Sequence, residues 1–173
     1  MSEQSSDTLI VNGERFYLGG YRNLDWVYPL EDYLNDHPEL VGPRSRRRIT
    51  TGWSSESRGY EGIWEIKNNG LYLVDIIAEF KKSKGFWFWK KLYLEPVTIS
   101  KLFPEAINNE IKATWFSGRL IAYTTNFVSG NVSSPDNTML FARFENGNLI
   151  SFQWYHLVER NGKIEKVPYD RTL

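Results

Sequence analysis

Residues 139–155 read Met139-Leu-Phe-Ala-Arg-Phe-Glu-Asn-Gly-Asn-Leu-Ile-Ser-Phe-Gln-Trp-Tyr155, and this stretch decides the fold class. Two runs rich in apolar and aromatic residues flank the dipeptide Asn146-Gly147. Asn-Gly favours a type I′ turn, because both residues tolerate positive φ and the turn matches the twist of the flanking strands. The stretch therefore predicts a β-hairpin that pairs residues 139–145 with residues 148–158.

The length of the turn sets which side chains of this hairpin face one another. A two-residue turn places Phe141 opposite Phe152. It also places Met139 opposite Trp154 and leaves Ile150 on the same face. Aromatic cross-strand pairs contribute roughly 0.2–1 kcal/mol each, so this register predicts a well-packed apolar face.

The same dipeptide occurs at three further positions, each between alternating or apolar runs. The predicted hairpins pair residues 9–11 with 14–18 across Asn12-Gly13, 62–67 with 71–77 across Asn69-Gly70, and 157–159 with 163–167 across Asn161-Gly162. The last ribbon is the most polar, so we expect it at a sheet edge.

The register of the hairpin around Asn69-Gly70 depends on the length of its loop. A two-residue turn places Trp64 opposite Asp75, whereas a three-residue loop over residues 68–70 places Trp64 opposite Val74. We prefer the three-residue loop, because it gathers large side chains on one apolar face. These side chains are Trp64, Ile66, Tyr72, Val74 and Ile76.

Weaker signals indicate the remaining elements. The helical spacing of Leu30, Tyr33 and Leu34 predicts a short helix that ends before Pro38. The other predicted elements are a long loop at 41–60, a turn at 81–85, a strand at 86–94 that Pro96 ends, a helical turn at 100–103, and a hairpin of 111–116 with 119–123.

Together these elements predict a mainly β fold, or a β-rich α+β fold. Antiparallel hairpins form a barrel-like or sandwich sheet, with one or two short helices. The 173 residues fit a single β-rich domain, which we place at residues 8–173. The polar residues 1–7 are expected to form a disordered tail.

Composition narrows the classes of function. The formal net charge is zero, which argues against a nucleic-acid partner. The chain has no Cys, which excludes disulfides and thiolate chemistry. No apolar run is long enough to span a membrane, and the N-terminal residues carry no signal-peptide pattern, so we expect a cytoplasmic protein.

No catalytic or metal-binding motif emerges from the sequence. The two His residues, His37 and His156, lack the HxH and HExxH spacings, and the P-loop and nucleophile-elbow patterns are absent. We therefore predict no metal ligand, no catalytic residue and no cofactor. An acid pair of the glycosidase type remains open, because scattered carboxylates can meet in three dimensions. The candidates are Asp25, Glu31, Asp32, Asp36, Glu61, Glu65 and Asp75.

A cluster of cations is the first candidate binding element. Arg46, Arg47 and Arg48 lie together in the predicted loop. Guanidinium groups suit phosphates and acidic protein surfaces, and a solvated loop is the alternative interpretation. We predict these three residues as binding residues.

An aromatic strand is the second candidate. Alternation sends Phe86 and Phe88 to one face and Trp87 and Trp89 to the other. We expect the two Phe in the core, because Phe has no polar atom, whereas a Trp N–H needs a partner. Trp87 and Trp89, with Lys90, are therefore predicted as binding residues.

A pattern in the middle of the chain combines three segments. They read Arg58-Gly-Tyr-x-Gly-x-Trp64-Glu-Ile-x-Asn-x-x-Leu71-Tyr-Leu73, Leu102-Phe-Pro104 and Ala113-x-Trp115-Phe-Ser-Gly118-x-Leu120. The pattern resembles one in small bacterial proteins of unassigned function. The resemblance implies a bacterial, cytoplasmic, stand-alone domain and carries over no catalytic residue.

These observations lead to three hypotheses about function. The first is a non-catalytic interaction protein that binds a protein partner, for example a bacterial immunity-type protein that neutralises a toxin by occlusion. It rests on the Arg and aromatic residues, which are enriched at interfaces. The second is a small-ligand or carbohydrate binder that uses Trp and Tyr in a barrel mouth. The third is an enzyme with a carboxylate-based site. The oligomeric state is left open.

Overall fold

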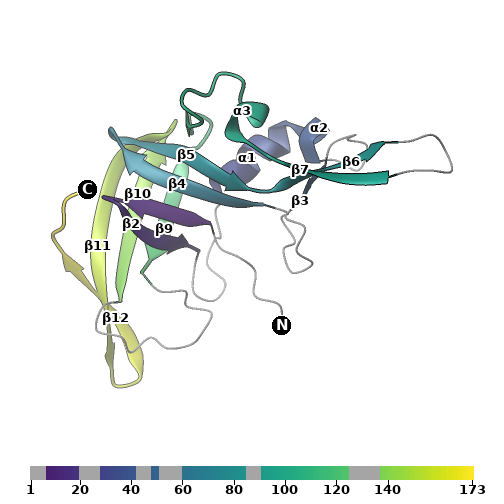
Figure 1. Cartoon of the computed structure of the whole chain (residues 1–173). Coiled ribbons are helices and arrows are strands. Elements are labelled where there is room, and N and C mark those ends of the chain that lie inside the picture. Colours follow the sequence, from purple (N-terminus) through teal and green to yellow (C-terminus); the bar gives the residue numbers. More distant parts are fainter. Residues whose placement is uncertain (1–6, 20–27, 42–47, 51–59, 85–90, 125–136) are drawn as a thin grey trace.

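The computed structural model describes residues 7–19, 28–41, 48–50, 60–84, 91–124 and 137–173. Most of these residues are in strands, and seven strands close into a barrel (Figure 1). The barrel strands are β1 (Thr8–Val11), β2 (Glu14–Leu18), β4 (Glu61–Lys67), β5 (Gly70–Ile77), β9 (Gly118–Tyr123), β10 (Thr138–Glu145) and β11 (Asn148–Arg160).

Neighbouring barrel strands follow the order β11-β10-β9-β2-β1-β4-β5, and β5 returns to β11. The pairs are antiparallel except for β1 with β4, which is parallel. The predicted β-rich, barrel-like fold is thus confirmed. The parallel pair was not predicted, because β1 and β4 are far apart in the sequence and no hairpin signal links them.

Three Asn-Gly dipeptides form two-residue hairpin turns, as predicted. Asn12, Asn146 and Asn161 have φ values of 52°, 49° and 54°, and the glycines that follow them have φ values of 80°, 71° and 71°. Both residues of each turn are therefore in the positive-φ region that a type I′ turn requires. The last turn joins β11 to β12 (Lys163–Tyr169), which lies at an edge of the sheet as expected.

The fourth predicted turn and its register were wrong. Asn68 and Asn69, with φ values of 48° and 56°, form the turn, and Gly70 begins β5. Trp64 pairs with Leu73, and a bulge shifts the register between Ile63 and Trp64. Asn tolerates positive φ almost as well as Gly, so the turn moved one residue earlier. The buried side chains of these strands include Trp64, Ile66, Leu71, Leu73 and Ile76, whereas Tyr72 and Val74 are only half-buried.

The predicted register of the β10–β11 hairpin was also wrong beyond its first pairs. A bulge between Arg143 and Phe144 leaves Ile150 without an opposite residue. Phe152 consequently pairs with Ala142 rather than Phe141, and Trp154 pairs with Leu140 rather than Met139. Bulges re-aim side chains in this way, and this one turns Trp154 inward onto the same face as Leu140, Ala142 and Phe144, which are buried.

The barrel closes where two hairpin turns meet. Leu71 N donates to Gly147 O at 2.9 Å, Gly147 N donates to Phe116 O at 2.8 Å, and Leu149 N donates to Asn69 O at 2.9 Å. A Cβ at Gly147 would lie 2.6 Å from Ala113 O. Glycine is therefore needed here twice, for its positive φ and for the close approach of the neighbouring main chain.

The predicted tail does not extend to Asp7. This residue is fully buried, and its carboxyl oxygens accept hydrogen bonds from Gly62 N at 3.1 Å and from Trp64 Nε1 at 2.9 Å. Its carbonyl accepts from Leu18 N at 2.7 Å. Asp7 thus ties the start of β1 to both β2 and β4. Residues 1–6 lie outside the described residues.

A second sheet contains β3 (Arg48–Thr50), β6 (Glu79–Lys84) and β7 (Lys91–Pro96). Two sequence predictions fail here, since residues 48–50 are a strand rather than loop and residues 81–84 are a strand rather than part of a turn. The end of a strand at Pro96 is confirmed. β6 pairs with β7 from Glu79 and Pro96 to Lys84 and Lys91, and the Lys-rich run carries no apolar alternation from which a strand could be predicted.

The predicted hairpin of 111–116 with 119–123 is absent from the described sheet. β8 (Ile111–Lys112) pairs with β5, and β9 pairs with β10 and β2. Residues 113–117 instead form a loop that contacts the β10–β11 turn, where Asn146 N donates to Ser117 Oγ at 2.8 Å. Pairing with distant strands replaces the local hairpin.

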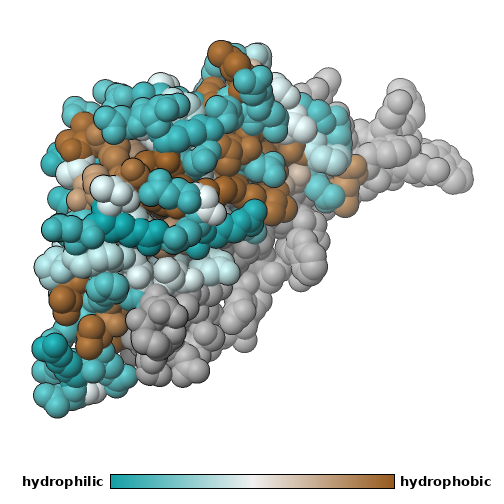
Figure 2. Space-filling model, turned by 60° about the vertical axis from the view of Figure 1, so that its left-hand side comes forward, coloured by the Kyte–Doolittle hydropathy of each residue, from teal (hydrophilic) through white to brown (hydrophobic). Residues whose placement is uncertain are grey.

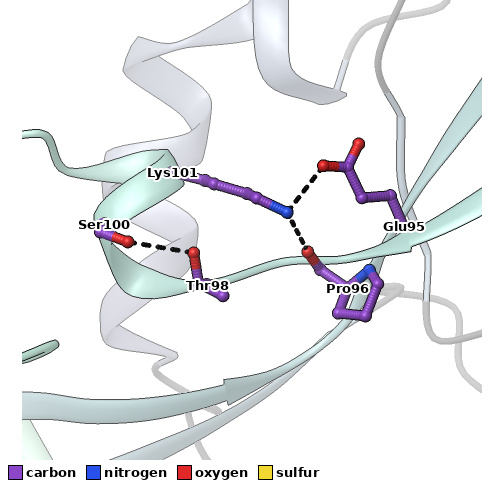
Figure 3. Close-up of polar contacts among 5 residues, drawn as sticks. All are labelled: Glu95, Pro96, Thr98, Ser100 and Lys101. Carbon is purple, nitrogen blue, oxygen red and sulfur yellow. Dashed lines mark hydrogen bonds and ion pairs between the residues drawn. The ribbon is translucent and has the colours of Figure 1, made fainter.

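The helices are α1 (Pro29–Asp36), α2 (Pro38–Val41) and α3 (Ile99–Leu102). α1 and α3 match the predicted helix and helical turn, whereas α2 was not predicted, because Pro38 was taken only as the end of the preceding helix. Tyr33 of α1 packs on Phe103 and Trp115, with ring centroids 4.4 and 5.1 Å away. Lys101 of α3 reaches back to the end of β7, where it contacts Glu95 at 2.7 Å and Pro96 O at 2.8 Å (Figure 3). In the described parts of the chain, no helix has the length and apolar character that crossing a membrane demands.

Candidate binding site

Most of the predicted binding residues cannot be placed. Arg46, Arg47, Trp87, Trp89 and Lys90 lie outside the described residues, as do Phe86 and Phe88. Arg48 is the first residue of β3 and pairs with Lys81 of β6. The binding roles of Arg48 and of the five predicted binding residues outside the described ranges stay predictions.

A surface pocket that the sequence did not indicate lies where β11 and β12 meet the C-terminal segment. We call residues 170–173 the strap and this cavity the strap pocket. Its volume is about 380 Å³. The lining residues come from β11, from the end of β12 and from the strap: Phe152, Gln153, Trp154, Tyr169, Asp170, Arg171 and Thr172.

Aromatic rings form the wall of the strap pocket. Trp154 is buried, and its ring centroid lies 5.3 Å from that of Phe16 on β2. Tyr169 is paired with Trp154 across the β11–β12 ladder, with centroids 6.4 Å apart. His156 stacks on Tyr169 at 3.9 Å with an interplanar angle of 16°. The bulge at Arg143 and Phe144 sets the facing of Trp154, so it also positions this wall.

Arg171 fastens the strap to the barrel. Its guanidinium lies 4.7 Å from the Trp154 ring centroid, a cation–π contact. It also forms an ion pair of 2.8 Å with Glu14 at the start of β2. The hydrogen bond to Glu14 raises the pKa of Arg171 further above its ordinary value. Asn12 Nδ2 donates to Thr172 O at 3.3 Å, so the strap is held to the β1–β2 hairpin at two points.

Gln153 joins the two strands under the pocket. Its Nε2 donates to the main-chain oxygens of Trp154 at 3.0 Å and Tyr169 at 3.2 Å. The indole Nε1 of Trp154 has no hydrogen-bond partner among the residues that the structure describes. The amide of Gln153 and the guanidinium of Arg171 therefore already hold the pocket walls together, and the rings supply its apolar surface.

Apolar side chains are exposed around the strap pocket and along the β11–β12 ribbon. The exposed fractions are 53% for Ile150, 40% for Phe152, 38% for Ile164 and 37% for Val167. Figure 2 shows hydrophobic residues in a band across the upper half of one face and in smaller groups near its lower tip, at the height of the ribbon in Figure 1. Such apolar surface beside a pocket is typical of a contact site.

The other charged clusters have structural partners. Lys67 Nζ lies 2.6 Å from Glu110 and 2.9 Å from Glu65, and these carboxylates raise the pKa of Lys67 above 10.5. Within the described ranges, no group of three or more His, Cys, Asp or Glu residues could hold a metal ion. His37 packs on Tyr33, and His156 packs on Tyr169.

Sequence reasoning missed the strap pocket because its parts are far apart in the chain. Glu14, Phe16, Trp154 and Arg171 meet only after the barrel has closed. Comparison of the chain with protein-family models, with curated proteins and with solved structures finds no match.

Proposed function

We propose that this protein is a non-catalytic binding protein that holds a protein partner at the strap pocket. The observation that carries the proposal is the composition of the pocket wall, which combines Phe152, Trp154, Tyr169 and Arg171. Trp, Tyr and Arg are the residue types that contribute most to binding energy at protein–protein interfaces.

The contacts of two polar side chains of the pocket, Arg171 and Gln153, support binding rather than catalysis. Arg171 is engaged with Glu14 and the Trp154 ring, and Gln153 is engaged with two main-chain oxygens. A general base or nucleophile must be within reach of a substrate and activated by a neighbour. The engaged groups offer rigidity and shape instead.

Phe152 is the expected anchor. It is 40% exposed at the rim of the pocket, while the ring of Trp154 beside it is buried. Burying the exposed part of a Phe side chain contributes on the order of 1 kcal/mol. A partner that inserts an apolar side chain would gain this energy together with contact to Tyr169.

The test uses two Phe-to-Ala variants. Phe152 and Phe141 lie on adjacent strands, but Phe152 pairs with Ala142 and Phe141 pairs with Gln153, so their side chains are on opposite faces of the sheet. A partner captured with the wild-type protein is identified, purified and titrated by calorimetry. We expect Phe152→Ala to weaken the affinity by about tenfold or more and Phe141→Ala to leave it unchanged. Equal affinities for the wild type and Phe152→Ala would refute the proposal.

The volume of the strap pocket favours a second candidate function. About 380 Å³ lies within the range of small-ligand sites, which is roughly 300–1,000 Å³. A carbohydrate or another small ligand that stacks on Tyr169 would therefore fit. Titration of mono- and oligosaccharides, followed by Trp fluorescence, tests this candidate, and saturable quenching that Phe152→Ala abolishes would support it.

An immunity-type role is one form of the first function. It makes a distinct expectation, because the gene of such a protein lies beside the gene of its toxin. A neighbouring toxin gene, with inhibition of that toxin lost in Phe152→Ala, would support this form. Binding to a partner that is not a toxin would exclude it and leave the broader proposal standing.

A further inference from the structure

The Asn-Gly turns at Asn12, Asn146 and Asn161 share a backbone shape, whereas Gly70 of the fourth pair begins β5. The four pairs differ in their surroundings, and this difference bears on their chemical stability. In an Asn-Gly pair the main-chain nitrogen of Gly can attack the side-chain carbonyl carbon of Asn, because Gly carries no Cβ to hinder it. The new C–N bond closes a five-membered imide, and ammonia leaves. Water then opens the ring at either carbonyl, which yields aspartate or isoaspartate.

The turn at Asn146 is protected from this reaction. The attacking nitrogen, Gly147 N, donates a 2.8 Å hydrogen bond to Phe116 O, and Gly147 is buried. Asn146 N is held by Ser117 Oγ at 2.8 Å. Attack requires these bonds to break at the seam where the barrel closes. Asn69 is restrained at the same seam, because Gly70 is buried and the main-chain oxygen of Asn69 accepts from Leu149 N at 2.9 Å.

The turn at Asn12 is held less firmly. Asn12 and Gly13 are both exposed, and the side-chain amide of Asn12 donates to Thr172 O at 3.3 Å. The strap therefore restrains the amide that must rotate toward the Gly nitrogen. We expect this turn to react at an intermediate rate.

The turn at Asn161 has neither form of protection. Asn161 and Gly162 are exposed, and no hydrogen bond ties the Asn161 side chain to another described residue. A Cβ built at Gly162 would meet no atom within 4 Å. The last residue of β11 with a main-chain hydrogen bond toward β10 is Leu157, whose N donates to Asn137 O at 2.9 Å, and among the described residues the ribbon beyond it contains only β11 and β12. Two-stranded ribbons open at low free-energy cost.

We propose that Asn161 is the site at which the folded protein deamidates spontaneously. Each event would add one negative charge to a chain of formal net charge zero, between Arg160 and Lys163. The isoaspartate product also lengthens the main chain of the turn by one carbon. The modification would thus alter the tip of the β11–β12 ribbon while the barrel stays intact.

The test compares site-resolved deamidation in the native protein and in urea. Both samples are incubated at mildly alkaline pH and digested, and the conversion at each of the four Asn-Gly sites is measured by mass spectrometry. The unfolded chain is the internal reference, because Gly follows Asn at each site. We expect Asn161 in the native protein to react within about threefold of its unfolded rate, and Asn146 and Asn69 to react about tenfold or more slowly than theirs.

Two controls make the assignment specific. Asn161→Gln should remove the first deamidated product of the native protein, and isoaspartyl methylation of the aged wild type should label the peptide that contains residue 161. Native protection of Asn161 equal to that of Asn146 would overturn the proposal. Equal rates at all sites in the native protein would overturn it as well.

Discussion

Removal of the Asp7 carboxyl group should destabilise the fold severely. The two oxygens accept from Gly62 N at 3.1 Å and Trp64 Nε1 at 2.9 Å, and both Asp7 and Trp64 are fully buried. Hydrogen bonds to such a group contribute about 1.5–3 kcal/mol each, because an unsatisfied buried donor costs its full desolvation energy. We therefore expect Asp7→Ala to lower the free energy of unfolding by about 3–5 kcal/mol, a large part of the total for a domain of this size.

Two further variants sharpen this prediction. Asp7→Asn keeps one acceptor oxygen, so it should cost about half as much as Asp7→Ala. Asp75→Ala is the matched control, because the Asp75 side chain is exposed and accepts from its neighbour Ile76 N at 2.8 Å. That variant should cost less than about 1 kcal/mol.

The measurement is urea unfolding followed by Trp fluorescence, with stability taken from the midpoint at an unchanged slope. The reasoning about Asp7 would be refuted if Asp7→Ala and Asp75→Ala had the same midpoint. It would also fail if Asp7→Asn were as damaging as Asp7→Ala, since the loss would then not follow the number of acceptors.

Three further predictions follow from the same structure. Gly147→Val places a Cβ 2.6 Å from a main-chain carbonyl oxygen at a φ of 71°, so it should lower the free energy of unfolding by about 2–4 kcal/mol. Gly162 has the same φ in open space, so Gly162→Val should lower it by only about 1 kcal/mol. The pKa of Lys67 is raised above 10.5, so its ion pairs contribute fully below pH 10.5 and are lost as the pH rises beyond it; Lys67→Met should flatten the decline of the thermal midpoint in that range. Trp115→Phe removes a 2.7 Å hydrogen bond to Pro29 O and should cost about 1 kcal/mol, measured by urea unfolding, whereas an unchanged midpoint would count against that bond.

Local chemistry explains what the sequence predicted correctly. The turns at Asn12, Asn146 and Asn161 depend on two residues that tolerate positive φ, so they can be read without knowledge of distant contacts. The short helix at residues 29–36 is equally local, since its apolar spacing and the Pro that follows it are adjacent in the sequence. The β-rich fold class follows from these hairpins, because the residues that they place in strands leave little of the chain for helices.

Distant contacts decided the rest. The turn before β5 moved to Asn68-Asn69 while Gly70 took its place at the barrel seam beside Gly147, which no neighbouring residue reveals. The bulge in β10–β11 shifted every later pair by one residue, because only the closed barrel determines which face is buried.

The candidate site depends on the tertiary structure in the same way. The strap pocket brings Glu14, Phe16, Trp154 and Arg171 together from both ends of the chain. Sequence periodicity reports only neighbours two to four residues apart. It therefore led to the predicted binding residues of the Arg cluster and of the aromatic segment at 86–90, and it did not indicate this pocket. Which strands close the barrel, and which side chains meet where the strap crosses it, is settled by packing over long sequence distances.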